Sequence, residues 1–229
     1  MQIKILSWNI WCDGDFKQIS DFLRASKADI IGLQEVVPGD KSRDVVSFLK
    51  ILGYEHAVAP IGSVFSDGRM ITSAIFSKYP IRASKMHMLS EESPRQAVEV
   101  SIKIKSATLK VFSLHTKHTH QKESDIQNLQ VENLIKVLPK EKVVVVGDFN
   151  ATPNMKPIKR LREILVDTDL KSLPTVNADL FDCDVCDSKQ TASTRLDYIF
   201  ASEDLKIHSP KVESGIGSDH FPISVMIEI

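Results

Sequence analysis

Apolar runs of strand length recur along the whole chain, separated by short polar segments. Such runs, rich in β-branched and aromatic residues and bounded by Gly, Pro, Asn or Asp, are typical of β-strands. They predict strands at residues 3–9, 28–36, 54–60, 71–78, 95–104, 107–115, 142–150, 195–202 and 221–229. Most of the chain therefore belongs to β-sheets.

A second pattern, with apolar residues three or four positions apart, predicts a minority of helices. Residues 15–27 carry Phe16, Ile19, Phe22 and Leu23 at this spacing, and residues 123–138 carry Ile126, Leu129, Leu134, Val137 and Leu138. Shorter helices are predicted at 44–52 and 157–165. Many strands with few helices indicate an α/β (α+β) protein in which two sheets pack face to face and helices cover the outside.

The strand at 142–150 ends abruptly in polar residues. Four consecutive valines suit a strand buried on both faces, and after Gly147 the alternation of side chains puts Asp148 and Asn150 on one side and Phe149 on the other. Because Gly, Asp and Asn favour turns, this stretch taken alone is better explained as the end of a strand.

Other strands end in the same way, which changes that interpretation. Asn9 closes the first strand, Glu35 closes the second on the side of Ile31 and Leu33, and His115 closes another in phase with Val111 and Ser113. Later in the chain, the candidates are Asp197, Asp219 and His220. Polar residues at so many strand ends predict a functional site at one rim of the sheets.

The residue types at this rim indicate a metal site with oxygen ligands. Carboxylates and amides favour Mg²⁺, or Mn²⁺, over Zn²⁺. Glu35 is the best candidate ligand, because Mg²⁺ in proteins often takes only one or two carboxylates. Asp197 and His220 can form a pair in which the carboxylate orients the imidazole as a base or as a cation facing a phosphate.

Seven motifs occur in order between Ser7 and Ile223: SWNIW, IIGLQEV, SAIFSKYPI, VFSLHTKH, VVVVGDFNATP, RLDYIF and GSDHFPI. Together they resemble the endonuclease/exonuclease/phosphatase superfamily, whose members include exonuclease III, deoxyribonucleases and neutral sphingomyelinases. The resemblance implies a four-layer α/β/β/α sandwich and metal-dependent hydrolysis of phosphoesters.

The resemblance also implies roles for the rim residues. Glu35 would bind Mg²⁺, with Asn9 and Asp219 beside it. Asp148 would orient or deprotonate the attacking water, and Asn150 would hold a phosphate oxygen. His220, positioned by Asp197, and His115 would act on the transition state, one as a base or charge stabiliser and the other as a proton donor.

Composition limits the number of domains, the class of protein and its cellular compartment. The 229 residues, 42% hydrophobic and 26% charged, are enough for one domain with its own core, and we expect a single catalytic domain over residues 1–229. Three cysteines are too few for a disulfide framework, and no apolar run reaches the length of a membrane span. We therefore expect a cytoplasmic monomer without stable membrane insertion.

The substrate is left open by the sequence. A net charge of −1 excludes an overall basic footprint for nucleic acid, so a nuclease acting on DNA or RNA is only narrowly preferred. A basic stripe of Lys117, Lys122, Lys156 and Lys159 near the cleft would favour it. The alternatives are a phospholipid head group, an inositol phosphate or a tyrosyl-DNA adduct, and an inactive binding module is a weaker one.

Three further features lie outside this assignment. Arg95 and Arg69 are candidate substrate contacts or surface arginines. Cys183 and Cys186 form a lone CxxC pair without a second pair of ligands, so the sequence does not predict a zinc site there.

Overall fold

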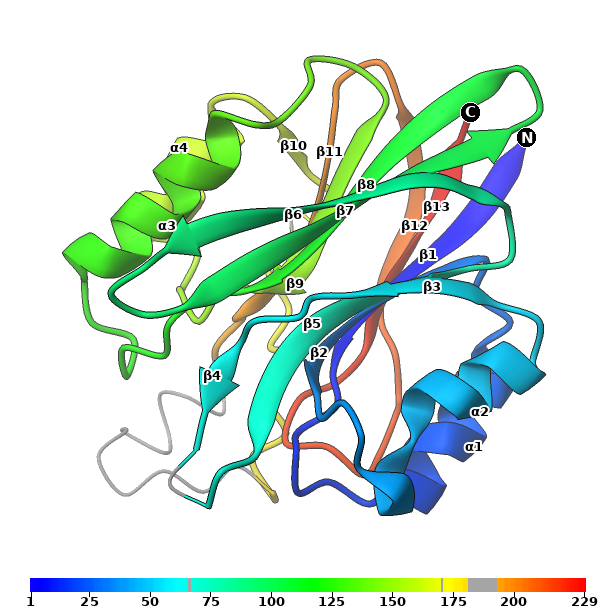
Figure 1. The fold of residues 1–229 in the computed structure, drawn as a ribbon. Coiled ribbons are helices and arrows are strands. Elements are labelled where there is room, and N and C mark those ends of the chain that lie inside the picture. The colour runs from blue at the N-terminus through cyan, green and yellow to red at the C-terminus, as the bar shows by residue number, and fades with distance from the viewer. Residues whose placement is uncertain (66, 170, 181–192) are drawn as a thin grey trace.

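Two β-sheets packed face to face form the body of the protein (Figure 1). The computed structural model describes residues 1–65, 67–169, 171–180 and 193–229. The first sheet has the strand order β12 (Lys206–Val212), β13 (Ile223–Glu228), β1 (Gln2–Asn9), β2 (Ile30–Val36), β5 (Met70–Ser77) and β3 (Glu55–Val58), and β4 (Ser63–Val64) also pairs with β5. The second has the order β10 (Val166–Asp167), β11 (Asp197–Ala201), β9 (Val143–Asp148), β8 (Ala107–His115), β7 (Arg95–Ile104) and β6 (Ile81–Ser90).

Helices cover the outer face of each sheet. In Figure 1, α1 (Phe16–Ser26) and α2 (Val45–Ile51) lie against the first sheet, and α3 (Asp125–Ile135) and α4 (Lys156–Arg162) lie against the second. A short 3₁₀ helix, η1 (Lys41–Arg43), precedes α2. Buried apolar side chains form three clusters, one between the sheets and one beneath each helical layer. This arrangement confirms the predicted α/β sandwich.

Strand alternation explains the three clusters. Along β9, Val144 and Val146 face the other sheet, whereas Val143 and Val145 face the helices. Both faces of the strand are therefore buried, as the four valines predict.

The layer between the sheets changes from apolar to polar along its length. The inward positions of β1 run from Ile3 and Ile5 to Ser7 and Asn9, all of them buried. On β8, Val111 is followed by Ser113 and His115 in the same alternation. The polar ends of these strands thus lie at one rim of the sandwich.

Strand pairing brings the polar ends together. The pairs β1–β2 and β8–β9 are parallel, and the other strand pairs in the described residues are antiparallel. His115 is in register with Asp148, and Asp148 with Asp197 on the neighbouring β11. Three candidate side chains therefore come from adjacent strands.

The helix α3 differs from the sequence prediction in the face that it buries. Leu129 shares the apolar spacing that predicts this helix, but 47% of its surface is exposed. The buried face carries Gln127 and Gln130 beside Val131 and Leu134. The apolar spacing does not predict this face, because the two glutamines are buried where they bond to backbone groups of neighbouring loops.

No helix in the described ranges combines the length and the apolar character that a membrane crossing needs.

Candidate active site

An aspartate–histidine pair stands at the polar rim. Asp197 begins β11 and His220 lies in the loop before β13, and Nδ1 of His220 is 2.8 Å from Oδ2 of Asp197. Both side chains are buried. Burial disfavours the charged ring, but the carboxylates of Asp197, Asp148 and Asp219 outweigh it and raise the pKa of His220 well above its usual value. The surrounding carboxylates therefore favour the charged form of the His220 ring, which is held on Asp197.

Asp148 lies opposite this pair and is held by two hydrogen bonds. Its Oδ1 accepts from the backbone N–H of Asn150 at 2.8 Å, and its Oδ2 accepts from Nδ2 of Asn9 at 3.0 Å. The same Oδ2 is 3.8 Å from Nε2 of His220. Burial raises the pKa of Asp148 to about 7, although His220 opposes the shift. This carboxyl group therefore binds a proton more readily than an exposed aspartate does.

Asn150 joins Asp148 to His115. Its Nδ2 is 2.9 Å from Nε2 of His115 and donates to the carbonyl of Thr116 at 3.2 Å. Because this amide nitrogen is a donor, Nε2 of His115 accepts, and the neutral ring carries its proton on Nδ1. Burial, reinforced by the charges of Arg95 and His220, lowers the pKa of His115 well below its usual value, in agreement with a neutral ring.

The amide of Asn150 is fully used in this arrangement. Its two hydrogens point at His115 and Thr116, so holding a phosphate oxygen, as the sequence resemblance implies, requires one of these bonds to be released. In the structure, the side chain of Asn150 orients His115.

Glu35 reaches the rim through an irregularity in β2. Its φ angle is +58°, and the register between β2 and β5 shifts between Leu33 and Val36. This bulge takes Glu35 out of phase with Ile31 and Leu33, which pack beneath the helices. The carboxylate instead accepts from Nδ2 of Asn9 at 3.1 Å and from the backbone N–H of Cys12 at 3.0 Å.

The rim fits a hard cation. Burial raises the pKa of Asp219 to about 6, and the nearby carboxylates of Glu35 and Asp197 add to the shift. Oδ1 of Asp197 is buried without a hydrogen-bond partner among the described residues. Carboxylates crowded in this way are stabilised by a divalent ion, and oxygen donors favour Mg²⁺ or Mn²⁺.

The tightest group of potential ligand atoms differs from the predicted metal ligands. One atom each of Asp148, Asp197 and His220 lies within 4.8 Å of the others. The hydrogen bond between Asp197 and His220 already uses two of these groups. The predicted ligands Asn9, Glu35 and Asp219 adjoin this group, since Asn9 contacts Asp148 and Asp219 precedes His220.

Arg95 is a buried arginine beside the rim. Only 9% of its surface is exposed, and its Nε has no hydrogen-bond partner in the described part of the chain. Burial lowers its pKa, while Glu35 and Asp148 act in the opposite direction. It lines one small depression with His115, Gly62 and Thr72. A buried guanidinium of this kind, facing an acidic rim, provides a binding group for an anion.

Arg69 already forms ion pairs with two aspartates. It bonds to Asp13 at 2.6 Å and to Asp67 at 2.7 Å, which ties the turn before β5 to the loop after β1. Unlike Arg95, it is already neutralised. The pair Cys183 and Cys186 lies outside the described residues.

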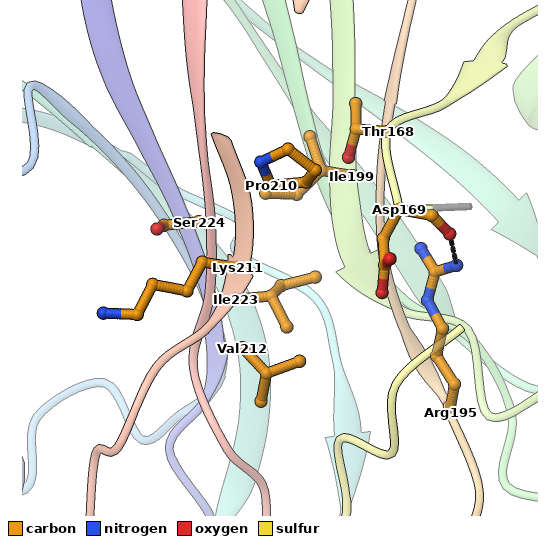
Figure 2. Close-up of a pocket in the computed structure, with 9 residues that line it drawn as sticks. All are labelled: Thr168, Asp169, Arg195, Ile199, Pro210, Lys211, Val212, Ile223 and Ser224. Carbon is orange, nitrogen blue, oxygen red and sulfur yellow. Dashed lines mark hydrogen bonds between the residues drawn. The ribbon is translucent and has the colours of Figure 1, made fainter. Parts of the chain in front are cut away.

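Figure 2 shows a different pocket, whose lining includes none of the candidate site residues. It lies between β11 and the β12–β13 pair, with Ile199 and Ile223 pointing into it and Arg195 bonded to the carbonyl of Asp169 at its edge. Its volume of about 10 Å³ is close to that of a single water molecule. It is a packing gap and not a substrate site.

Fold and rim together define a phosphoester hydrolase. The chain belongs to the Endonuclease/Exonuclease/phosphatase family, whose sequence model matches residues 6–220. Members of this family are typically dependent on divalent metals, and this chain has a buried cluster of acidic residues and histidine. A search of curated proteins found no match.

Solved structures of low sequence identity share the fold. The catalytic domain of human Nocturnin with bound sulfate is 18% identical, with a TM-score of 0.79 over 99% of this chain and 93% of that one. A mannosyl-6-phosphatase from Bacteroides thetaiotaomicron is 18% identical, with a TM-score of 0.70 over 99% and 100%. ANGEL2, a 2′,3′-cyclic phosphatase, is 15% identical, with a TM-score of 0.75 over 99% and 95%.

Proposed function

We propose that the protein is a divalent-metal-dependent phosphodiesterase that acts on nucleic acid. The observation that carries the reaction class is the position of Asp148, a buried carboxyl group held by Asn9 and Asn150 and facing the cation of His220. Such a group can take a proton from water while its neighbours bind the anionic phosphate.

Each side chain then has a role set by its protonation state. Asp148, with a pKa of about 7, orients the attacking water and accepts its proton. His220 presents a positive charge to the phosphate oxygens, and Asp197 keeps its ring in place. His115, neutral with its proton on Nδ1, is the candidate hydrogen-bond donor to the leaving oxygen. Arg95 binds a further phosphate oxygen.

Glu35, Asn9 and Asp219 would hold the cation, Mg²⁺ or Mn²⁺. When bound, it supplies charge that neutralises the phosphate oxygens in the transition state. Asn9 also bridges Glu35 and Asp148 through its Nδ2, at 3.1 and 3.0 Å. That bridge sets the distance between the metal ligand and the proposed base.

Lysines in the segment after β8 and at the start of α4 support a polyanionic substrate. Lys117 follows Thr116 directly, and the backbone N–H of Lys156 bonds to Glu123 at 3.0 Å, which brings the start of α4 close to the segment that contains Lys122. Lys159 lies one turn further along α4. These charges suit the backbone of a nucleic acid, although the net charge of −1 predicts modest affinity.

The deciding experiment compares substrates under controlled metal conditions. Hydrolysis is measured on bis-p-nitrophenyl phosphate, p-nitrophenyl phosphate and labelled single- and double-stranded DNA and RNA, each with Mg²⁺, Mn²⁺ or EDTA. We expect metal-dependent cleavage of a nucleic acid and of the small diester. Turnover of the small diester alone would move the substrate to lipid head groups, inositol phosphates or tyrosyl-DNA adducts, and turnover of the monoester alone would indicate a phosphatase.

Undiminished activity in EDTA would contradict the metal-dependent mechanism. Absence of turnover on every substrate would support the inactive binding module instead.

A further inference from the structure

The buried glutamine Gln127 on α3 reaches three backbone carbonyls beside the active site. Its Nε2 is 3.1 Å from the carbonyl of Lys117, 3.0 Å from that of Phe149 and 3.1 Å from that of Asn150. Lys117 lies in the loop after β8, and the other two lie in the turn after β9. One side chain therefore joins the loop that follows His115 to the turn that contains Asn150.

Packing does not account for a glutamine at this position. A helix lying on a sheet usually buries apolar residues, and burying an amide costs free energy unless its hydrogen bonds are made. Oε1 of Gln127 has no hydrogen-bond partner among the described residues, so only the donor side of the amide is used. The position needs hydrogen-bond donors aimed at the loops.

The turn held by Gln127 contains a residue in the left-handed backbone region. Asn150 has a φ of +46°, a conformation that asparagine adopts more readily than other non-glycine residues but that an unconstrained turn need not take. In this conformation its backbone N–H reaches Asp148 and its side chain reaches His115. Both contacts depend on the orientation of the peptides at 149 and 150.

We propose that Gln127 is a positioning residue of the active site. By binding the carbonyls of Phe149 and Asn150, it holds the turn in the conformation that aims Asn150 at His115 and Asp148. This inference rests on the proposed function in one respect, namely that Asn150 and His115 take part in the reaction.

The test replaces the donor without changing the size of the side chain. Gln127→Met is expected to lower kcat for bis-p-nitrophenyl phosphate by about 10- to 100-fold, because small displacements of reacting groups have effects of this size, with KM changed by less than about threefold. In an Asn150→Ala background, the same substitution should have almost no further effect on kcat, since both residues act through one turn.

Asn133→Leu is the matched control on the same helix. Asn133 also donates to a backbone carbonyl, that of Leu89 at 2.9 Å, at the end of β6. Its loss should lower the melting temperature and leave kcat unchanged. A Gln127→Met enzyme that loses stability but keeps the kcat of the wild type would overturn the proposal.

A crystal structure of Gln127→Met separates this inference from the proposed function. The positive φ of Asn150 and its contact with His115 should both be lost. Their persistence would overturn the positioning role whatever the activity. If the wild-type protein hydrolyses none of the phosphoesters, the proposed function fails, and the crystal structure still decides whether Gln127 positions the turn.

Discussion

At the scale of single residues, two buried aspartates that both stand at strand ends in the sequence have different surroundings in the structure. Asp197 is paired with His220 at 2.8 Å, and it balances the charge of that ring. Asp148 accepts from the uncharged donors of Asn9 and Asn150, and its pKa is raised to about 7. We therefore assign orientation of a histidine to Asp197 and proton transfer to Asp148.

Substitution of Asp148 should remove turnover and leave the fold intact. Asp148→Asn keeps the shape of the side chain but cannot accept a proton, so kcat for bis-p-nitrophenyl phosphate should fall by roughly 10²–10⁴-fold, and His220→Ala should have a similar effect. The exposed Asp21 on α1 serves as control, and Asp21→Asn should leave kcat unchanged and lower the melting temperature only slightly through loss of its ion pair with Lys17. Wild-type turnover in Asp148→Asn would exclude Asp148 from the mechanism.

Glu213 should make the free energy of unfolding depend on pH in the acid range. Burial disfavours its charge, but hydrogen bonds from Lys211, Lys4 and Ser224 outweigh this and lower its pKa from 4.5 to about 2. A carboxyl group whose pKa is lower in the folded than in the unfolded protein stabilises the folded state at every pH above its unfolded pKa. This contribution disappears as the pH falls from about 4.5 to 2.

The measurement is urea unfolding of the wild type and of Glu213→Gln across this range. At pH 7 the variant should be less stable by roughly 1–2 kcal/mol, after allowance for screening by solvent. The difference should shrink toward pH 2, and a difference independent of pH would contradict the ion-pair explanation.

At the scale of elements, the pairing of β8 with β9 positions His115 beside Asp148. The two strands approach closely at Gly147, where an added Cβ atom would lie 2.2 Å from the carbonyl oxygen of Leu114. A backbone carbonyl within a sheet cannot withdraw without loss of its own hydrogen bonds. The glycine therefore allows the register in which the two side chains meet.

Gly147→Ala should destabilise the protein by about 1–3 kcal/mol, the usual effect of steric overlap in a packed interior. Gly39 is a suitable comparison, because no atom lies within 4 Å of a Cβ added there and only its positive φ of 84° opposes a side chain. Gly39→Ala should thus cost less, about 1 kcal/mol. Equal losses in urea unfolding would show that close approach of the strands is unimportant.

At the scale of the whole molecule, folding gathers carboxylates from distant parts of the chain at one rim. Glu35, Asp148, Asp197 and Asp219 come from four separate segments, and Asp148 and Asp219 both have raised pKa values. Their mutual repulsion opposes folding unless a cation balances it.

A bound divalent ion should therefore stabilise the fold. Mg²⁺ or Mn²⁺ at 100 times its dissociation constant should add about 2.7 kcal/mol to the free energy of unfolding, and EDTA should remove this gain. Thermal unfolding with MgCl₂ is compared with NaCl of equal ionic strength, for the wild type and for Glu35→Gln. A Glu35→Gln variant that responds to Mg²⁺ as the wild type does would exclude Glu35 as a ligand.

The sequence by itself determined the fold class and predicted the strand-end residues of the candidate site. Strand alternation and apolar runs are local properties, so β1, β8 and β9 and their polar ends Asn9, His115 and Asp148 could be predicted from the chain. The edge strands β6 and β12 could not, because their side chains are largely exposed and carry no apolar pattern.

Only the tertiary structure decided how the site residues face one another. The bulge that turns Glu35, the left-handed turn at Asn150, the burial of Arg95 and the inward face of α3 at Gln127 all depend on groups distant in the sequence. Local periodicity cannot predict them, since each is a departure from a regular strand or helix that is stabilised by long-range hydrogen bonds and packing.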